Sequence, residues 1–107
     1  MPVAEVNGTQ LSYEVNGSGP NLVFIHGENH GIEMFRDQVA DFSNDHRCVT
    51  YYRRGHGPSG SPPYGYSLWN QTLDLKGLLE ELGIDQAVLV AVAMSTPIAV
   101  SYAVQHP

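Results

Sequence analysis

Short apolar runs separated by polar and glycine-rich turns fill the first quarter of the chain. Val3 to Val6 and Leu11 to Val15 are β-prone, and Asn7-Gly8 between them is the dipeptide typical of a hairpin turn. A second turn cluster, Asn16 to Pro20, leads into Leu22 to Ile25, which is apolar without interruption. Such a run is typical of a strand buried on both faces, as in a parallel sheet.

The pattern then alternates between helical and strand signals. Apolar residues close to helical spacing predict a helix from Ile32 to Phe42, and the β-branched and aromatic residues of Arg47 to Tyr52 predict a strand. Arg53 to Tyr66 is rich in Gly, Pro and Ser and is predicted to be a loop. Ser67 is a candidate N-cap for the next helix, and Gly83 stands where a C′ glycine would end that helix.

The last stretch predicts one more strand and one more helix. Ala87 to Val92 is all apolar, and a helix is expected from about Ser95 to Gln105, with Pro97 tolerated in its first turn. The order is β-β-β-α-β-α-β-α, which indicates an α/β fold with a mostly parallel sheet of about five strands, an N-terminal hairpin and three helices. Without a repeat or a linker, residues 1–107 are expected to form one folding unit.

Composition narrows the classes of protein. Hydrophobic residues make up 42% of the 107 residues, which is enough to build a core. The net charge of −6 argues against a nucleic-acid partner. The single cysteine, Cys48, excludes an internal disulfide. No basic start precedes an apolar run, and no apolar stretch approaches the length of a membrane span. We therefore expect a soluble, cytoplasmic chain without a membrane partner.

Four segments together resemble the α/β-hydrolase family, in its N-terminal part only. Leu22 to Gly27 resembles the family's strand and His-Gly turn, and Tyr51 to Ser59 resembles its Asp-x-Arg-Gly-His-Gly-x-Ser loop. Tyr66 to Ile84 resembles the helix after that loop, and Val88 to Pro107 resembles the elbow strand with its helix. The resemblance implies the sheet order 1-2-4-3-5, no cofactor, and a hydrolytic lineage acting on ester, lactone or related acyl substrates. Tyr52 departs from the family's Asp.

The resemblance places an alanine where the family carries its nucleophile. A gapless match over Val88 to Pro107 aligns Ala91-Val92-Ala93-Met94-Ser95 with the Gly-x-Ser-x-Gly elbow, so Ala93 takes the serine position. A methyl group cannot attack a carbonyl, and Ala93 is not the Asp of the ester-intermediate variant either. Ser95 is the less favoured nucleophile, because using it would shift the next helix by two residues and turn its apolar face away.

The remaining machinery is incomplete as well. The family's acid and general-base His follow the nucleophile in chain order, and no histidine here matches that base. The resemblance implies that the backbone N–H groups of Glu28 and Met94 form the oxyanion site. The Glu28 carboxylate is expected to repel a developing oxyanion. His26 and His56 match family positions that support loops, and we predict no catalytic residue in this chain.

Metal and nucleotide sites are not predicted. His26 and His30 have the spacing of two ligands on one helix, but they lie in a loop and no third ligand has suitable spacing. Gly55, Gly57 and Gly60 do not lie between a strand and a helix, so they do not form a phosphate-binding fingerprint.

Three functional hypotheses follow. The first is a truncated, inactive relative of the α/β-hydrolases; the second is a non-catalytic protein that binds a small molecule in the remaining cleft; the third is a chain completed by a partner that supplies the missing strands and His. Ala93 argues against the third for serine chemistry, and the short length argues against the second, so the first is favoured. Ala87 to Val92 would be an open, apolar sheet edge, and self-association through it is expected.

Overall fold

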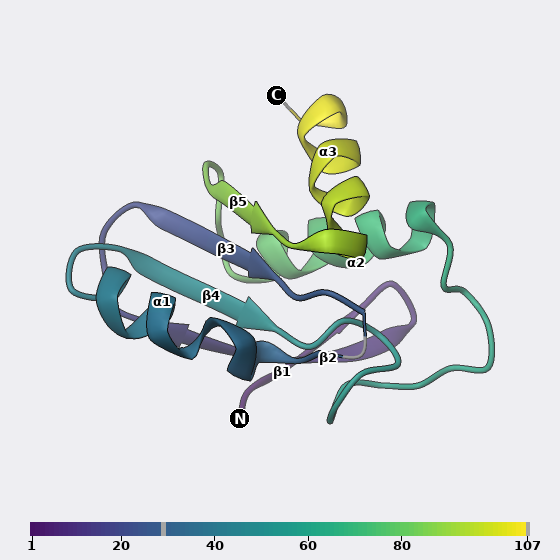
Figure 1. The fold of residues 1–107 in the computed structure, drawn as a ribbon. Coiled ribbons are helices and arrows are strands. Elements are labelled where there is room, and N and C mark those ends of the chain that lie inside the picture. Colours follow the sequence, from purple (N-terminus) through teal and green to yellow (C-terminus); the bar gives the residue numbers. More distant parts are fainter. Residues whose placement is uncertain (29, 107) are drawn as a thin grey trace.

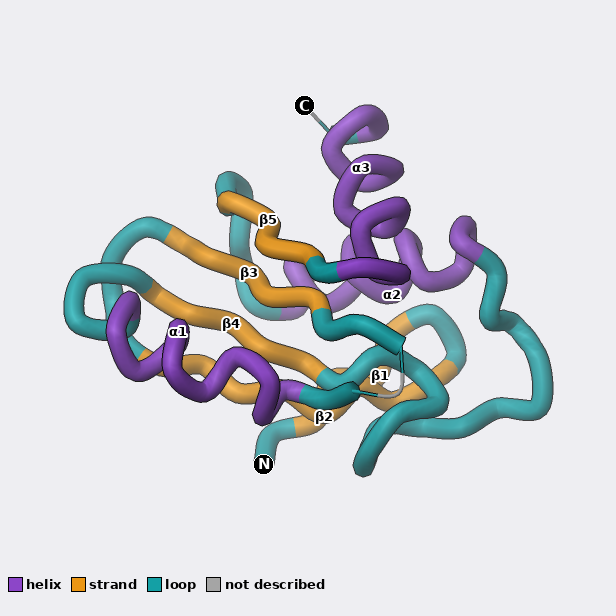
Figure 2. Tube along the Cα trace, in the orientation of Figure 1, coloured by secondary structure: helices purple, strands orange, loops and turns teal. Residues whose placement is uncertain are grey.

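The computed structural model describes residues 1–28 and 30–106. Its elements follow the predicted order (Figures 1 and 2) and are β1 (Val3–Val6), β2 (Thr9–Asn16), β3 (Asn21–Ile25), η1 (Ile32–Phe35), α1 (Arg36–Phe42), β4 (Arg47–Tyr51), α2 (Leu68–Glu81), β5 (Val88–Ala91), η2 (Ala93–Ser95) and α3 (Thr96–Gln105). The predicted helices at Ile32 and Ser95 each begin with a 3₁₀ turn, η1 and η2, before the α-helix starts. The other bounds shift by one or two residues, where helices and strands fray.

The sheet has the predicted order β1-β2-β4-β3-β5. The hairpin strands pair antiparallel with each other and β2 pairs antiparallel with β4, whereas β3 runs parallel to both β4 and β5. The sheet is therefore mixed, and its parallel part is the set β4-β3-β5. The carboxyl ends of β3 and β5 lie at the same end of the sheet because the two strands are parallel, which brings the turns after them together.

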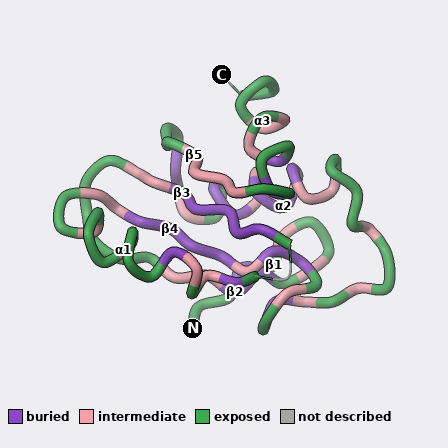
Figure 3. Tube along the Cα trace, in the orientation of Figure 1, coloured by how far each residue is buried: buried purple, intermediate pink, exposed green. Residues whose placement is uncertain are grey.

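Helices cover both faces of the sheet, and β3 contributes to both cores (Figures 1 and 3). Val23 and Ile25 pack in the cluster that includes Leu75 and Leu78 of α2. Phe24 points to the opposite face, where it packs against Phe35, with the ring centroids 5.0 Å apart. Alternate residues of an apolar run thus fill two layers, as the prediction of a strand buried on both faces requires.

Local turn chemistry fixes the ends of two elements. Asn7 and Gly8 have φ values of 48° and 75°, both positive as the hairpin turn between β1 and β2 requires. The Ser67 hydroxyl accepts a hydrogen bond from the Asn70 N–H at 3.2 Å, which confirms the predicted N-cap of α2. At the other end of α2, Gly83 has φ +67° and the Ile84 N–H donates to the Leu79 carbonyl, the bond of a Schellman motif.

A buried ion pair fastens the long loop and the hairpin to α2. Arg54 donates from Nε and Nη2 to the two carboxylate oxygens of Asp74, at 2.6 and 2.8 Å. Both side chains are at most 5% exposed. The Asn7 side chain donates to the same carboxylate at 3.0 Å, and Arg54 also donates to the Gly65 carbonyl at 2.8 Å. The bidentate pair satisfies charges that would otherwise be costly to bury.

The described residues contain no helix with the combined length and apolar character that crossing a membrane requires. The accessible surface of 5801 Å² is close to the roughly 5,900 Å² expected for a folded monomer of this mass. Residues 1–28 and 30–106 therefore pack as one body.

Candidate functional site

The chain turns sharply from β5 into α3, and Ala93 lies at the turn. Val92 is still extended, with φ −130° and ψ 132°, but Ala93 has φ +54°. A left-handed backbone costs a residue with a side chain about 1–2 kcal/mol, so such a residue is uncommon outside sites where the surroundings impose it. The Ala93 residue is exposed at this strand-to-helix turn, and its role as the vacant nucleophile position stays a prediction.

Ser95 does not present its hydroxyl to a substrate. The residue is fully buried, and its Oγ accepts from the Val92 N–H at 2.9 Å. The same hydroxyl donates to the Ile25 carbonyl at 2.8 Å. Ser95 thus ties the elbow to the end of β3, which agrees with a structural role at the start of the helix rather than with nucleophilic chemistry.

The turn after β3 lies directly against the elbow. A Cβ built on Gly27 would be 3.9 Å from the Ala93 Cβ and 3.4 Å from the Val92 carbonyl oxygen, so a side chain here would fill the gap between the two turns. Glu28 follows Gly27, and Met94 follows Ala93 with 66% of its surface exposed. The two predicted oxyanion donors therefore belong to neighbouring turns, and their joint action on an oxyanion remains a prediction.

The Glu28 carboxylate has a cationic partner, which the sequence did not reveal. Its Oε1 lies 3.2 Å from Nη2 of Arg53, whose side chain is 5% exposed, and its Oε2 lies 3.8 Å from Nε2 of His56. Arg53 also donates to Gln71 at 2.7 Å and to the His26 carbonyl at 3.3 Å. The sequence analysis expected the Glu28 carboxylate to repel an oxyanion, but it did not include Arg53. A buried guanidinium offsets the negative field of the carboxylate.

His26 acts as a structural hydrogen-bonding group. Its Nε2 accepts from the Arg53 N–H at 2.9 Å, so its Nδ1 carries the proton and donates to the Gly27 carbonyl at 2.8 Å. The pKa of His26 is lowered from 6.5 to about 4, mainly by burial; the hydrogen bond to the Gly27 carbonyl opposes this shift, and the nearby His56 and Arg53 add to it. The imidazole is neutral at pH 7 and joins the ends of β3 and β4.

The other histidines contact different parts of the fold. His46 contacts Asp45 at 2.6 Å, His106 stacks on Tyr102, and the ring of His56 packs against His26 at 4.8 Å between centroids. His30 is different, because its Cδ2 lies 3.9 Å from the Cβ built on Gly27, the same position that faces Ala93. The sequence pattern indicated His30 only as half of a metal pair and did not predict its place beside Gly27.

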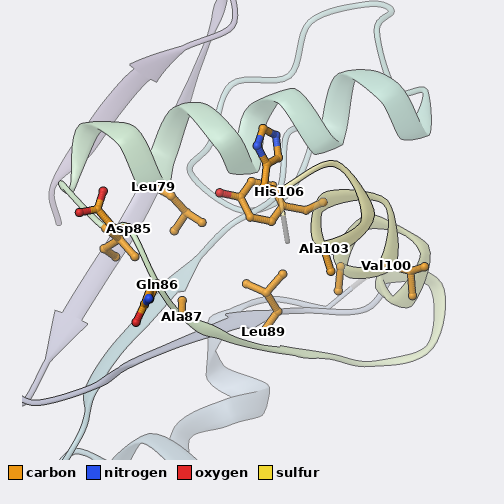
Figure 4. A pocket seen from close by; sticks show the side chains of 11 residues that line it. Leu79, Asp85, Gln86, Ala87, Leu89, Val100, Ala103 and His106 are labelled. Carbon is orange, nitrogen blue, oxygen red and sulfur yellow. The ribbon is translucent and has the colours of Figure 1, made fainter.

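The described residues hold no group of three or more His, Cys, Asp or Glu arranged to bind a metal ion. A hollow of about 830 Å³ lies away from the elbow turn, between α2, β5 and α3 (Figure 4). Its lining residues are Leu79, Ile84, Asp85, Gln86, Ala87, Leu89, Ala99, Val100, Tyr102, Ala103 and His106. None of the predicted site residues lines it.

Comparison with known proteins identifies the architecture. The sequence profile of the alpha/beta hydrolase fold matches residues 20–107. The epoxide hydrolase 1 of Caenorhabditis elegans is 33% identical over 92% of this chain and 25% of its own length, and the 2-(acetamidomethylene)succinate hydrolase of Mesorhizobium japonicum is 27% identical over 96% of this chain and 37% of its own. The enol-lactonase of Burkholderia xenovorans LB400 superposes with a TM-score of 0.93 and 33% identity, over 98% of this chain and 42% of that one.

The chain thus spans between 25% and 42% of the length of these relatives. All three are hydrolases by name, but the reaction chemistry differs among them, from epoxides to an enol-lactone. The shared feature is the fold, which does not by itself specify one chemistry.

Proposed function

The chain belongs to the alpha/beta hydrolase fold family, and we propose that it descends from hydrolases of ester, lactone or related acyl substrates but has itself lost nucleophilic catalysis. The observation that carries the proposal is Ala93, a methyl group held in the left-handed backbone conformation of an elbow. Acyl transfer through this elbow needs an oxygen on that residue to form the covalent intermediate. The kinship with an enol-lactonase supports an acyl substrate for the lineage.

The contacts of Ser95 support the same reading. A serine that replaced the lost nucleophile would need an exposed Oγ, and this hydroxyl is buried between the Val92 N–H and the Ile25 carbonyl. If the Ser95 hydroxyl turned outward, its two backbone partners would be left buried without hydrogen bonds, at a cost of about 1–3 kcal/mol. Glu28 and Met94 are the proposed oxyanion donors, and the proposal leaves them without a nucleophile because Ala93 carries only a methyl group.

Two assays test the loss of catalysis. The purified chain should hydrolyse p-nitrophenyl acetate no faster than an unrelated protein at the same concentration, and a serine-reactive fluorophosphonate probe should leave it unlabelled. Turnover above that control would contradict the proposal. Labelling that peptide mass spectrometry assigns to Ser95 would show that the elbow is used in the shifted register.

Restoring the hydroxyl tests what else is missing. Ala93→Ser alone should not restore hydrolysis, because no histidine of the chain matches the family's general base. His30 is the histidine to test first, because its Cδ2 and the Ala93 Cβ would each lie 3.9 Å from a Cβ on Gly27. The double variant Ala93→Ser/His30→Ala is therefore the control: activity in the single variant that disappears in the double one would identify His30 as a base and overturn this part of the proposal.

A second candidate function is the binding of a small molecule without catalysis. It is favoured by the retention of φ +54° at Ala93, since a strained backbone persists where the surrounding structure still imposes it. The test is an NMR titration of ¹⁵N-labelled protein with δ-valerolactone. Saturable shifts of the Glu28 and Met94 amide signals would favour binding at the two turns, and unchanged signals at millimolar lactone would refute it.

A further inference from the structure

Arg53 is a buried cation that contacts the turn after β3. Its side chain is 5% exposed, and its Nη2 lies 3.2 Å from Oε1 of Glu28. Among the described residues, Glu28 is the one carboxylate that forms an ion pair with this guanidinium. Burying a charge without a counter-ion is costly, so a guanidinium in this position requires an anion beside it.

Three hydrogen bonds to neutral groups hold the Arg53 side chain independently of Glu28. Its Nε and Nη2 donate to Oε1 of Gln71 at 3.0 and 2.7 Å, and its Nη1 donates to the His26 carbonyl at 3.3 Å. These acceptors satisfy donors of the guanidinium but do not neutralise its charge. The cation is therefore held in one orientation whichever anion lies beside it, and this preorganisation lowers the entropy cost of binding.

The adjacent pair of Arg54 and Asp74 shows by contrast how loosely Glu28 is held. Arg54 donates to both oxygens of Asp74, at 2.6 and 2.8 Å, and both side chains are buried. Glu28 offers Arg53 a single oxygen at 3.2 Å, and the Glu28 side chain is half-exposed. That distance exceeds the range of about 2.7–2.9 Å for a strong charge-assisted bond. The Glu28 carboxylate is therefore weakly held, and another anion can replace it.

The two oxygens of Glu28 define the shape of the anion that fits. Oε1 faces Nη2 of Arg53, and Oε2 lies 3.8 Å from Nε2 of His56, so one carboxylate spans two nitrogens from two residues. The Nδ1 of His56 lies 3.1 Å from the Arg54 carbonyl, which only accepts, so Nδ1 carries a proton. Protonation of the ring then makes Nε2 a donor toward the anion. A planar group with two oxygens and one negative charge matches these contacts.

These nitrogens are connected to the turn that faces Ala93. Strands β3 and β4 pair in parallel, so their carboxyl ends lie side by side (Figure 1). The Arg53 N–H donates to Nε2 of His26 at 2.9 Å, and Nδ1 of His26 donates to the Gly27 carbonyl at 2.8 Å. A Cβ on Gly27 would lie 3.9 Å from the Ala93 Cβ. Two hydrogen bonds thus fix Arg53 against the turn that lies beside the elbow.

We propose that Arg53 and His56 bind the carboxylate of a small organic acid, and that Glu28 is an internal carboxylate which this ligand displaces. Binding breaks the contact between Glu28 and Arg53 and forms the same contact with the ligand, so the guanidinium stays paired with an anion. The other hydrogen bonds of Arg53 persist. The proposal does not depend on the loss of nucleophilic catalysis, because binding an anion needs no nucleophile at residue 93.

An NMR titration of ¹⁵N-labelled protein with sodium acetate tests the site, at pH 7 and at an ionic strength held constant with sodium chloride. The Nε–H signal of Arg53 should shift saturably. Glu28→Gln should lower the dissociation constant for acetate at least 10-fold, because it removes the competing carboxylate and keeps the shape of the side chain. The matched control, Glu81→Gln, removes one negative charge at the far end of α2 and should leave the constant within twofold of the wild-type value. Acetamide, which has the shape of acetate without its charge, should bind at least 10-fold more weakly.

A second substitution tests whether Arg53 is the cation that binds acetate. In the Glu28→Gln background, Arg53→Gln should abolish saturable acetate shifts, with circular dichroism as the check that the variant is folded. If that variant does not fold, Arg53→Lys keeps the charge but loses the planar donor group, and it should weaken acetate binding at least 10-fold. The proposal is overturned by equal acetate affinity in the wild type and Glu28→Gln, by an equal gain from Glu81→Gln, or by acetamide binding as tightly as acetate. Acetate binding that is unchanged by substitution of Arg53 also overturns it.

Discussion

Acid should destabilise this protein through one buried imidazole, His26. The side chain is fully buried and its Nε2 accepts a hydrogen bond from the Arg53 N–H at 2.9 Å. Protonation of Nε2 would replace this bond by two opposed donors, beside the Arg53 guanidinium and 4.8 Å from the ring of His56. Burial accordingly lowers the pKa of His26 from 6.5 to about 4. His26 therefore binds a proton less readily in the folded state than in the unfolded chain.

The sign and size of the effect follow from this difference. Between the unfolded pKa of 6.5 and the folded value of about 4, the unfolded chain binds more protons, so stability is fully present above pH 6.5 and is lost as the pH falls toward 4. A difference of 2.5 units between 6.5 and 4 corresponds to about 3 kcal/mol in total. At pH 4.5, linkage gives a loss of about 2.5 kcal/mol relative to pH 7.5.

Urea unfolding followed by circular dichroism at pH 7.5 and pH 4.5 measures this loss. Carboxylates also titrate in this range, so the comparison is with His26→Gln, whose amide can accept from the Arg53 N–H and donate to the Gly27 carbonyl without titrating. The free energy of unfolding should fall by about 2.5 kcal/mol more in the wild type than in the variant. Equal losses in both proteins would refute the argument and would mean that His26 gains its proton without breaking the turn.

Two further changes test the contacts around the loop and the elbow. Asp74→Asn leaves the Arg54 guanidinium buried without its anion and should lower the free energy of unfolding by about 3–5 kcal/mol. The matched change at an exposed pair, Asp37→Asn, should leave the midpoint of urea unfolding unchanged. Equal midpoints for both variants would show that the buried pair does not stabilise the fold. Ser95→Ala removes the hydroxyl bond to the Ile25 carbonyl and should cost about 1–3 kcal/mol by the same measurement, and a variant as stable as the wild type would contradict the role assigned to Ser95.

Apolar runs and turn residues were sufficient to predict most of the fold. Leu22 to Ile25 specified a strand buried on both faces because every position is apolar, and Asn7-Gly8 specified a hairpin because both residues tolerate positive φ. The strand order came from the family resemblance and not from periodicity. What the pattern missed were the 3₁₀ turns η1 and η2, because the apolar spacing is nearly the same for a 3₁₀ start and an α-helical one over so few residues.

The site divides in the same way. The absence of an oxygen nucleophile at Ala93 could be predicted from the sequence, because the identity of a side chain decides whether it can attack. The environment of Glu28 could not, because its partners Arg53 and His56 are 25 and 28 residues away along the chain, and only the packing of the loop against the turn brings them to 3.2 and 3.8 Å.

The sequence by itself therefore determined which elements form and that residue 93 carries no oxygen, since both depend on local side-chain types and their spacing. Tertiary structure decided the rest: that His26 is neutral and bonded between two turns, that Ser95 is buried, and that His30 and Ala93 both lie close to Gly27. These properties depend on desolvation and on distances between segments remote in sequence, and such quantities exist only once β3, β4 and β5 lie side by side in the sheet.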